Sequence, residues 1–136
     1  MRRGKLPAWL VVLGLLVLVG GIGQARGPAP RKRLSRAELE ALARDVGFPD
    51  PVFAATIAMR ESGGDPNAIN DTRGRTDLPA GTTNEHSIGL WQINLLAHPK
   101  FQAGDMLDAR RNAEAAFEVS QRGTNWGPWS TAKGGG

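Results

Sequence analysis

The spacing of apolar residues predicts two helices at the start of the folded part of the chain. Ser35 and Glu38 have the spacing of a capping box, and apolar residues then recur every three to four positions up to Gly47. A second helix is expected to begin with Asp50 as its N-cap and to follow an almost continuous apolar run up to Gly63. Each helix therefore has a predicted start, a predicted buried face and a predicted end.

Farther along the chain the pattern is less regular. Residues 65–86 are polar and rich in glycine and proline, which predicts a loop or a short hairpin. A short helix is expected over 89–95, and a longer one from Asp108, its N-cap, to Arg122, with Gly123 after it. Because no stretch alternates convincingly enough for a long strand, the sequence predicts a mostly α domain.

The N-terminal end has a different pattern. Residues 6–23 contain no charged side chain, and as a helix they would span roughly 27 Å, the low end for a lipid bilayer. An uncleaved transmembrane anchor is favoured by this length and by the bases that follow at 26–33. The alternative is a signal peptide cleaved near 23–25. Either segment would place the rest of the chain on the extracytoplasmic side, anchored to the membrane or secreted.

These patterns divide the chain into four predicted segments. They are a membrane anchor or signal segment over 1–23, a basic proline-containing linker over 24–34, the folded domain over 35–132 and a flexible glycine tail over 133–136. A domain of roughly 100 residues supports one modest core. We expect this domain to be monomeric.

The charge distribution argues against a nucleic-acid-binding protein. The sequence pI is near 10.3 and the net charge is +4, but residues 1–33 carry seven bases and no acid. Residues 34–136 carry ten bases against thirteen acids, a net charge of −3. A nucleic-acid interface would need a basic face on the folded part. We therefore expect no nucleic-acid partner and a membrane contact only through the N-terminal helix.

The sequence predicts neither a metal nor another cofactor. It contains no cysteine, which excludes a disulfide scaffold, a thiolate metal site and cysteine catalysis. His86 and His98 have no partners at the spacing of metal ligands.

Glu61 is the residue that breaks the apolar pattern of the second helix. It lies one turn after Ile57 and two turns after Ala54, inside the apolar arc of that helix. A carboxyl group in this position, at the negative end of the helix dipole, suits a general acid at neutral pH. The alternative interpretation is a last-turn glutamate that points into solvent.

Four motifs then follow one another in a recognisable order. They are ESGG at 61–64 with NAIN at 67–70, SIGLWQIN at 87–94, DARRNAEAA at 108–116 and NWGPWST at 125–131. Together, over about residues 36–131, they resemble the lytic transglycosylase and goose-type lysozyme superfamily. The resemblance implies a lysozyme-like α+β fold with little β-structure. It also implies cleavage of peptidoglycan glycan strands at the β-1,4 bond between N-acetylmuramic acid and N-acetylglucosamine.

The same resemblance implies roles for three residues. Glu61 would be the single acid/base, while the N-acetyl group of the substrate stabilises the oxocarbenium-like centre. Ser62 would hold the N-acetyl or peptide side of the substrate, and Gln92 would bind its acetamido group. Glu61 would then activate either the muramyl 6-hydroxyl, as in a lytic transglycosylase, or water, as in a lysozyme.

Five further residues have two interpretations each. Glu85 is either a second carboxylate or a solvated loop residue, and Asn94 either lines the cleft or only closes the predicted short helix. Trp126 and Trp129 flank a Gly-Pro turn and suit either sugar stacking or core packing. Trp91 is a core residue or, alternatively, a platform for a sugar ring.

The predicted function is therefore cleavage of peptidoglycan, in cell-wall remodelling or in phage lysis or entry. In the phage setting the protein would be a lysis protein or a component of the virion. The alternative is a non-catalytic peptidoglycan-binding or envelope-assembly protein on a lysozyme-like fold.

Overall fold

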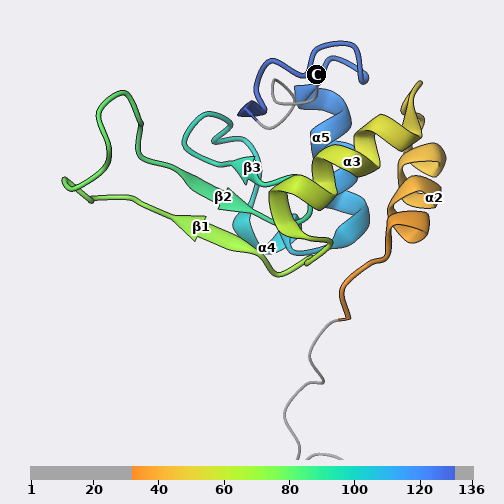
Figure 1. Cartoon of the computed structure of the whole chain (residues 1–136), viewed down its shortest axis with the longest axis horizontal. Coiled ribbons are helices and arrows are strands. Elements are labelled where there is room, and N and C mark those ends of the chain that lie inside the picture. Colours follow the sequence, from red (N-terminus) through yellow and green to blue (C-terminus); the bar gives the residue numbers. More distant parts are fainter. Residues whose placement is uncertain (1–31, 131–136) are drawn as a thin grey trace, which may run out of the picture. The chain divides into compact units, whose positions relative to one another are not determined.

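The computed structural model describes residues 32–130, which form four helices and a small sheet (Figure 1). The helices are α2 (Arg36–Val46), α3 (Pro51–Ser62), α4 (Ala103–Met106) and α5 (Ala109–Val119), and the strands are β1 (Ile69–Asp71), β2 (His86–Ile88) and β3 (Ile93–Asn94). The strands are antiparallel and lie in the order β1-β2-β3. The domain is mostly helical, as the sequence predicts.

The predicted ends of the first two helices are confirmed. The Ser35 hydroxyl accepts the Glu38 backbone N–H at 3.2 Å, and the Glu38 carboxylate accepts the Ser35 N–H at 2.7 Å, which completes the capping box before α2. Asp50 accepts the Phe53 N–H at 3.0 Å before α3. Glycines in the left-handed conformation end both helices, as predicted.

The core is built around α3 and one buried tryptophan. Ala54, Ile57 and Ala58 of α3 are fully buried together with Leu39 of α2, and both α3 and α5 pack against α2. Trp91 is also fully buried, and its indole N–H donates to the carbonyl of Ala54 at 3.0 Å. Trp91 is therefore a core residue and offers no surface to a sugar.

The predicted helix over 89–95 is wrong. The chain instead makes a buried turn, and Ile93 and Asn94 then pair with β2 as strand β3. Gly89 has a φ of +84° and Gln92 a φ of +48°, so neither residue adopts the helical backbone. Pairing with β2 thus overrides the helix-like spacing of the apolar residues.

Two other segments refine the prediction. The polar segment 65–86 forms the hairpin of β1 and β2, with Ile69 opposite Ile88, so the hairpin alternative is confirmed. Helix α5 begins after Asp108 as predicted but ends at Val119, because Gln121 and Arg122 have φ values of +52° and +64°.

The predicted membrane anchor or signal segment at 1–23 and the glycine tail at 133–136 lie outside the described residues. Within 32–130, no helix has the length and apolar character needed to cross a membrane.

Candidate active site

A cleft with a volume of about 580 Å³ opens beside the C-terminal end of α3. Its walls come from the end of α3 and the turn after it, from all three strands, from the turn before β3 and from the C-terminal segment 128–130. The polar side chains that line it are Arg33, Glu61, Ser62, Asp65, Asn70, Glu85, Ser87, Gln92, Asn94 and Ser130. Six of the seven residues named from the sequence as site candidates, all except Trp126, therefore line one cavity.

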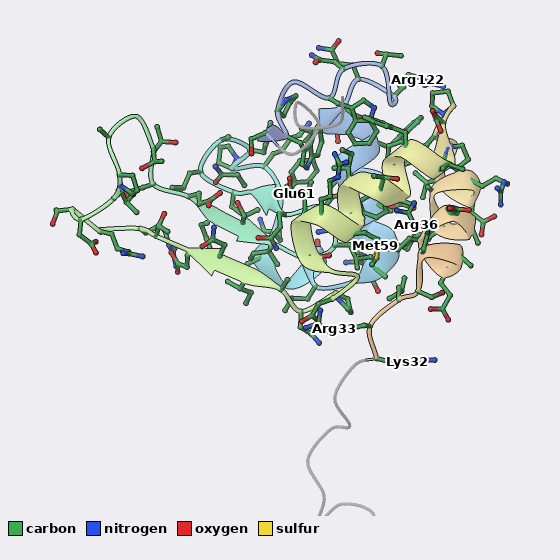
Figure 2. The ribbon with its side chains drawn as sticks, viewed as in Figure 1. Lys32, Arg33, Arg36, Met59, Glu61 and Arg122 are labelled. Atoms are coloured by element: carbon green, nitrogen blue, oxygen red, sulfur yellow. The ribbon has the colours of Figure 1, made fainter. Side chains whose placement is uncertain are left out.

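Glu61 lies in the last turn of α3, on the face that continues the buried residues Ala54 and Ile57. Figure 2 shows Glu61 at the end of the helix that lies next to the sheet. Its side chain is partly buried and lines the cleft. Because Glu61 continues the buried face of α3, its carboxyl group lies at the boundary between the core and the cavity.

The hydroxyl of Ser62 is used to close the end of α3. It donates to the Ala58 carbonyl at 3.0 Å and accepts the Gly64 N–H at 3.2 Å. Ser62 lines the cleft, but its proton is already committed to the helix. A contact with substrate would therefore use the remaining lone pair of the hydroxyl oxygen as an acceptor.

Glu85 is held in the cleft by two side chains. The Asn70 amide donates to one of its carboxylate oxygens, and the Ser87 hydroxyl donates to the other at 2.9 Å. Asn70 and Ser87 are register partners on β1 and β2, so the hairpin itself orients the Glu85 carboxylate. Glu85 is partly buried, which makes it more than a solvated loop residue.

Gln92 reaches the cleft from the buried turn. Its amide N–H groups donate to the carbonyls of Ala68 and Gly89, both at 3.0 Å. No described residue donates to its amide oxygen, which leaves an acceptor beside the cleft for a substrate N–H. The donors of Gln92 fix the orientation of this acceptor.

Asn94 both closes a turn and lines the cleft. Its amide oxygen accepts the N–H groups of His86 at 3.2 Å and Leu96 at 3.1 Å. It also lines a second pocket of about 170 Å³ that shares Gln92 and Trp129 with the cleft. Asn94 therefore lines the cleft, as one interpretation proposed, and also closes a local turn, although the short helix of the other interpretation does not form.

The two tryptophans of the last motif have different surroundings. Trp129 is 4 % exposed, donates its indole N–H to the Trp91 carbonyl at 2.6 Å and contributes to the wall of the cleft. Trp126 stacks on Phe48 with ring centroids 5.6 Å apart and meets Phe53 edge-on at 5.5 Å. Trp126 packs against Trp129 with ring centroids 5.2 Å apart, but it is absent from the described lining of the cleft.

Five polar residues of the cleft were not identified from the sequence as site candidates: Arg33, Asp65, Asn70, Ser87 and Ser130. Asn70 and Ser87 acquire their importance from strand pairing, which no local pattern specifies. Asp65 accepts the Asn67 N–H at 2.9 Å within the turn after α3, and it also lines the cleft. Arg33 was assigned to the linker, and no local signal marked it.

The cleft holds three carboxylates, those of Glu61, Asp65 and Glu85. Among residues 32–130, no three histidine or acidic side chains are grouped so that they could hold a metal ion. The three carboxylates can supply acid–base chemistry, and the other polar side chains of the wall can supply hydrogen bonds.

The mostly helical fold and the acid at the end of a buried helix define a small lysozyme-like domain. Residues 40–131 match the model of the family described as the lysozyme-like domain, and this protein belongs to that family. The match supports the resemblance to lytic transglycosylases and lysozymes that the motifs indicate. A comparison with curated proteins finds no match.

Proposed function

We propose that this domain cleaves peptidoglycan glycan strands at the β-1,4 bond between N-acetylmuramic acid and N-acetylglucosamine, with Glu61 as the acid/base. The observation that carries the proposal is the position of Glu61, partly buried at the end of α3 and in the wall of a polar cleft. Membership of the lysozyme-like family supports peptidoglycan as the substrate.

The proposed reaction begins with Glu61 in its carboxylic acid form. Its proton passes to the glycosidic oxygen as the C1–O bond breaks, and the N-acetyl carbonyl of the substrate attacks C1 as the leaving sugar departs. The Glu61 carboxylate then takes a proton from the muramyl 6-hydroxyl or from water, whose oxygen bonds to C1. The first route gives a 1,6-anhydro end and the second a reducing end, and both return Glu61 to the acid form.

The other cleft residues would position the sugars. The free acceptor of Gln92 suits the acetamido N–H, and Asn94 extends the same wall toward the smaller pocket. Glu85, with both oxygens oriented, is the candidate second carboxylate that would direct water. Trp129 lines the cleft, and the packing of Trp126 against its ring favours an indirect role for Trp126.

The test is lysis of purified sacculi by the Glu61→Gln variant, followed as a fall in turbidity. We expect a loss of about 10²-fold or more, because general acid–base catalysis contributes on this scale. Glu114→Gln is the matched control, since Glu114 is an exposed acid of α5 whose side chain pairs with Arg110. Unchanged lysis by Glu61→Gln would contradict the mechanism.

Mass spectrometry of the released fragments distinguishes the two routes of the second step. Anhydro ends identify a lytic transglycosylase and reducing ends a lysozyme, and Glu85→Gln is expected to reduce only the second product. Binding of the wild-type chain to sacculi without any released fragment would favour the non-catalytic binding protein.

We propose that the domain is monomeric and works outside the cytoplasmic membrane, delivered there by the apolar segment 6–23. Fractionation of cells that express the full chain tests this location. Copurification with membranes supports an anchor, recovery in the medium supports a cleaved signal, and copurification with phage particles supports a virion role.

A further inference from the structure

The end of the predicted linker is attached to the turn that follows α3. The Leu34 N–H donates to the Gly64 carbonyl at 2.8 Å. A Cβ at Gly64 would lie 2.2 Å from the Leu34 carbonyl oxygen, so this close approach of two backbones requires glycine. Residues Arg33 and Leu34, named here the arm, therefore have a fixed place beside the candidate acid.

The arm places Arg33 among the residues that line the cleft. Its Nη1 lies 3.4 Å from the Ser62 carbonyl and 3.5 Å from the Gly63 carbonyl, and its Nη2 lies 3.6 Å from the Asp65 carboxylate. These contacts are long, and the side chain is 65 % exposed. An arginine has five N–H donors, so this guanidinium keeps capacity for a ligand.

The charge of Arg33 distinguishes it within the cleft. Among the described residues that line the cavity it is the one cation, and it lies beside Asp65, one of the three acids there. It also precedes residues 40–131, which match the family, so Arg33 lies outside the matched part of the chain.

We propose that Arg33 binds a carboxylate of the peptidoglycan strand, either the lactyl carboxylate of a muramyl residue or a carboxylate of its stem peptide. This inference rests on the proposed function. The guanidinium fork matches a carboxylate in two parallel hydrogen bonds, and the muramyl sugar is the one that carries these groups. Arg33 would thereby distinguish peptidoglycan from uncharged chitin-type glycans of the same backbone.

Asp65 sets the strength of this contact. Its carboxylate lies beside the guanidinium and competes with the carboxylate of the ligand. Asp65→Asn removes the competing charge and keeps an amide oxygen that accepts the Asn67 N–H. The two variants Arg33→Gln and Asp65→Asn are therefore expected to change substrate binding in opposite directions.

The experiment measures kcat and KM of the full chain on three substrates. They are intact soluble glycan strands, strands whose stem peptides have been removed so that the lactyl carboxylate is free, and chitooligosaccharides without any carboxylate. Arg33→Gln should raise KM about 2- to 5-fold on a carboxylated substrate, the scale of an exposed ion pair, and leave chitooligosaccharides unchanged. The KM of Arg33→Lys should lie between those of the wild type and Arg33→Gln, and Asp65→Asn should lower the KM.

The substrate on which the effect appears identifies the source of the carboxylate. An effect confined to intact strands assigns the stem peptide, and a larger effect on stripped strands assigns the lactyl group. Salt at 0.5 M should reduce the difference between Arg33→Gln and the wild type, because it screens exposed charges. Arg44→Gln, an exposed arginine of α2, is the matched control for loss of one positive charge.

An equal change of KM on all three substrates, or no change on any, would overturn the inference. Its failure is separate from that of the proposed function, which Glu61→Gln tests. Cosedimentation of the Glu61→Gln chain with intact and with stripped strands, with and without Arg33→Gln, reports carboxylate binding without any turnover. Equal binding of the two chains to both kinds of strand at low salt would also overturn the role of Arg33.

Discussion

Two segments that adjoin β2 keep their shapes by opposite means. The buried turn, Gly89–Gln92, follows β2 and is held by distant parts of the chain. The Asn112 amide oxygen accepts the Trp91 N–H at 2.9 Å, and the Asn112 amide N–H groups donate to the Ile88 and Met106 carbonyls at 2.8 and 3.0 Å. Both Asn112 and Trp91 are fully buried, so these bonds have no competition from water.

The hairpin loop, 72–84, precedes β2 and depends on its own neighbours. Arg73 pairs with Asp71 at 2.6 Å and Arg75 pairs with Asp77 at 2.7 Å, each two residues away. In Figure 1 this loop extends away from the helices. These two ion pairs are exposed and local, and local exposed pairs contribute little to stability.

The difference follows from what each segment carries. The buried turn presents Gln92 to the cleft, so its position must be fixed by the core. None of residues 72–84 is among the described residues that line the cleft. Glu85, which follows the hairpin loop, does line it and is fixed by the paired strands. The structure therefore predicts large effects of substitution in the buried turn and small ones in the hairpin loop.

The largest expected contrast is between two glycines with similar backbones. Gly89 has a φ of +84° and Gly74 a φ of +76°. A Cβ at Gly89 would lie 2.2 Å from both the Asn112 amide nitrogen and the Met106 carbonyl, whereas a Cβ at Gly74 would meet nothing within 4 Å. We expect Gly89→Ala to lower the free energy of unfolding by more than about 4 kcal/mol, and Gly74→Ala by about 1 kcal/mol.

Urea denaturation followed by tryptophan fluorescence measures both glycine variants. The backbone strain is nearly the same at the two positions, so the difference reports the overlap with Asn112 and Met106 alone. Similar losses for the two variants would show that the buried turn adapts as readily as the hairpin loop.

The next contrast removes the side chain that holds the buried turn. Asn112→Ala leaves the Trp91 N–H and the Ile88 and Met106 carbonyls without this partner, and we expect a loss of about 3 kcal/mol. Asn84→Ala, an exposed asparagine of the hairpin loop, is the control and should cost well under about 1 kcal/mol. Thermal unfolding of both variants, with KM measured at a temperature where both are folded, tests the contrast.

The effect on KM sharpens the interpretation of Asn112→Ala. Because the buried turn carries Gln92, loosening it should raise KM as well as lower stability, whereas Asn84→Ala should change neither. A loss of stability with an unchanged KM would mean that Gln92 is positioned independently of Asn112.

A smaller effect is expected where the cleft wall meets the core. Trp129→Phe keeps an aromatic ring but removes the indole N–H that donates to the Trp91 carbonyl at 2.6 Å. We expect a loss of about 1–2 kcal/mol, since a buried carbonyl loses its donor. Trp126→Phe removes a bond to the Gly123 carbonyl at 3.2 Å and is the matched control. Equal losses of unfolding free energy in the two variants would show that the bond from Trp129 to the buried turn contributes no more than the bond of Trp126.

The same comparison explains which parts of the fold could be predicted from the sequence. The capping box of Ser35, the N-caps Asp50 and Asp108 and the glycine that ends α3 act within a few residues, so the local sequence contains the whole signal. Glu61 was also found this way, because its place on the buried face depends only on the helical period. These are features that no distant contact needs to specify.

The buried turn could not be predicted, because its conformation depends on residues far along the chain. Leu90, Trp91 and Ile93 have a helix-compatible spacing, and Asn112, twenty-one residues after Trp91, determines the actual backbone. Asn70 and Ser87 likewise meet only because β1 pairs with β2, and Arg33 reaches the cleft because the Leu34 backbone N–H bonds to the turn after α3. Long-range pairing of this kind leaves no periodic trace in the sequence.

The smallest expected effect concerns the ion pair at the base of the hairpin loop. The Arg73 guanidinium holds the pKa of the Asp71 carboxyl well below its usual range, chiefly through their side-chain hydrogen bond. A depressed pKa stabilises the fold above the pKa of the unfolded chain, and this contribution is lost as the pH falls through the folded value.

Because both side chains are exposed, we expect Asp71→Asn to leave the melting temperature at pH 7 nearly unchanged. Melting curves of the variant and the wild type should converge further as the pH falls and as salt rises. A drop at pH 7 as large as that of Asn112→Ala would show that the hairpin loop is coupled to the core, and the contrast between the two segments would no longer hold.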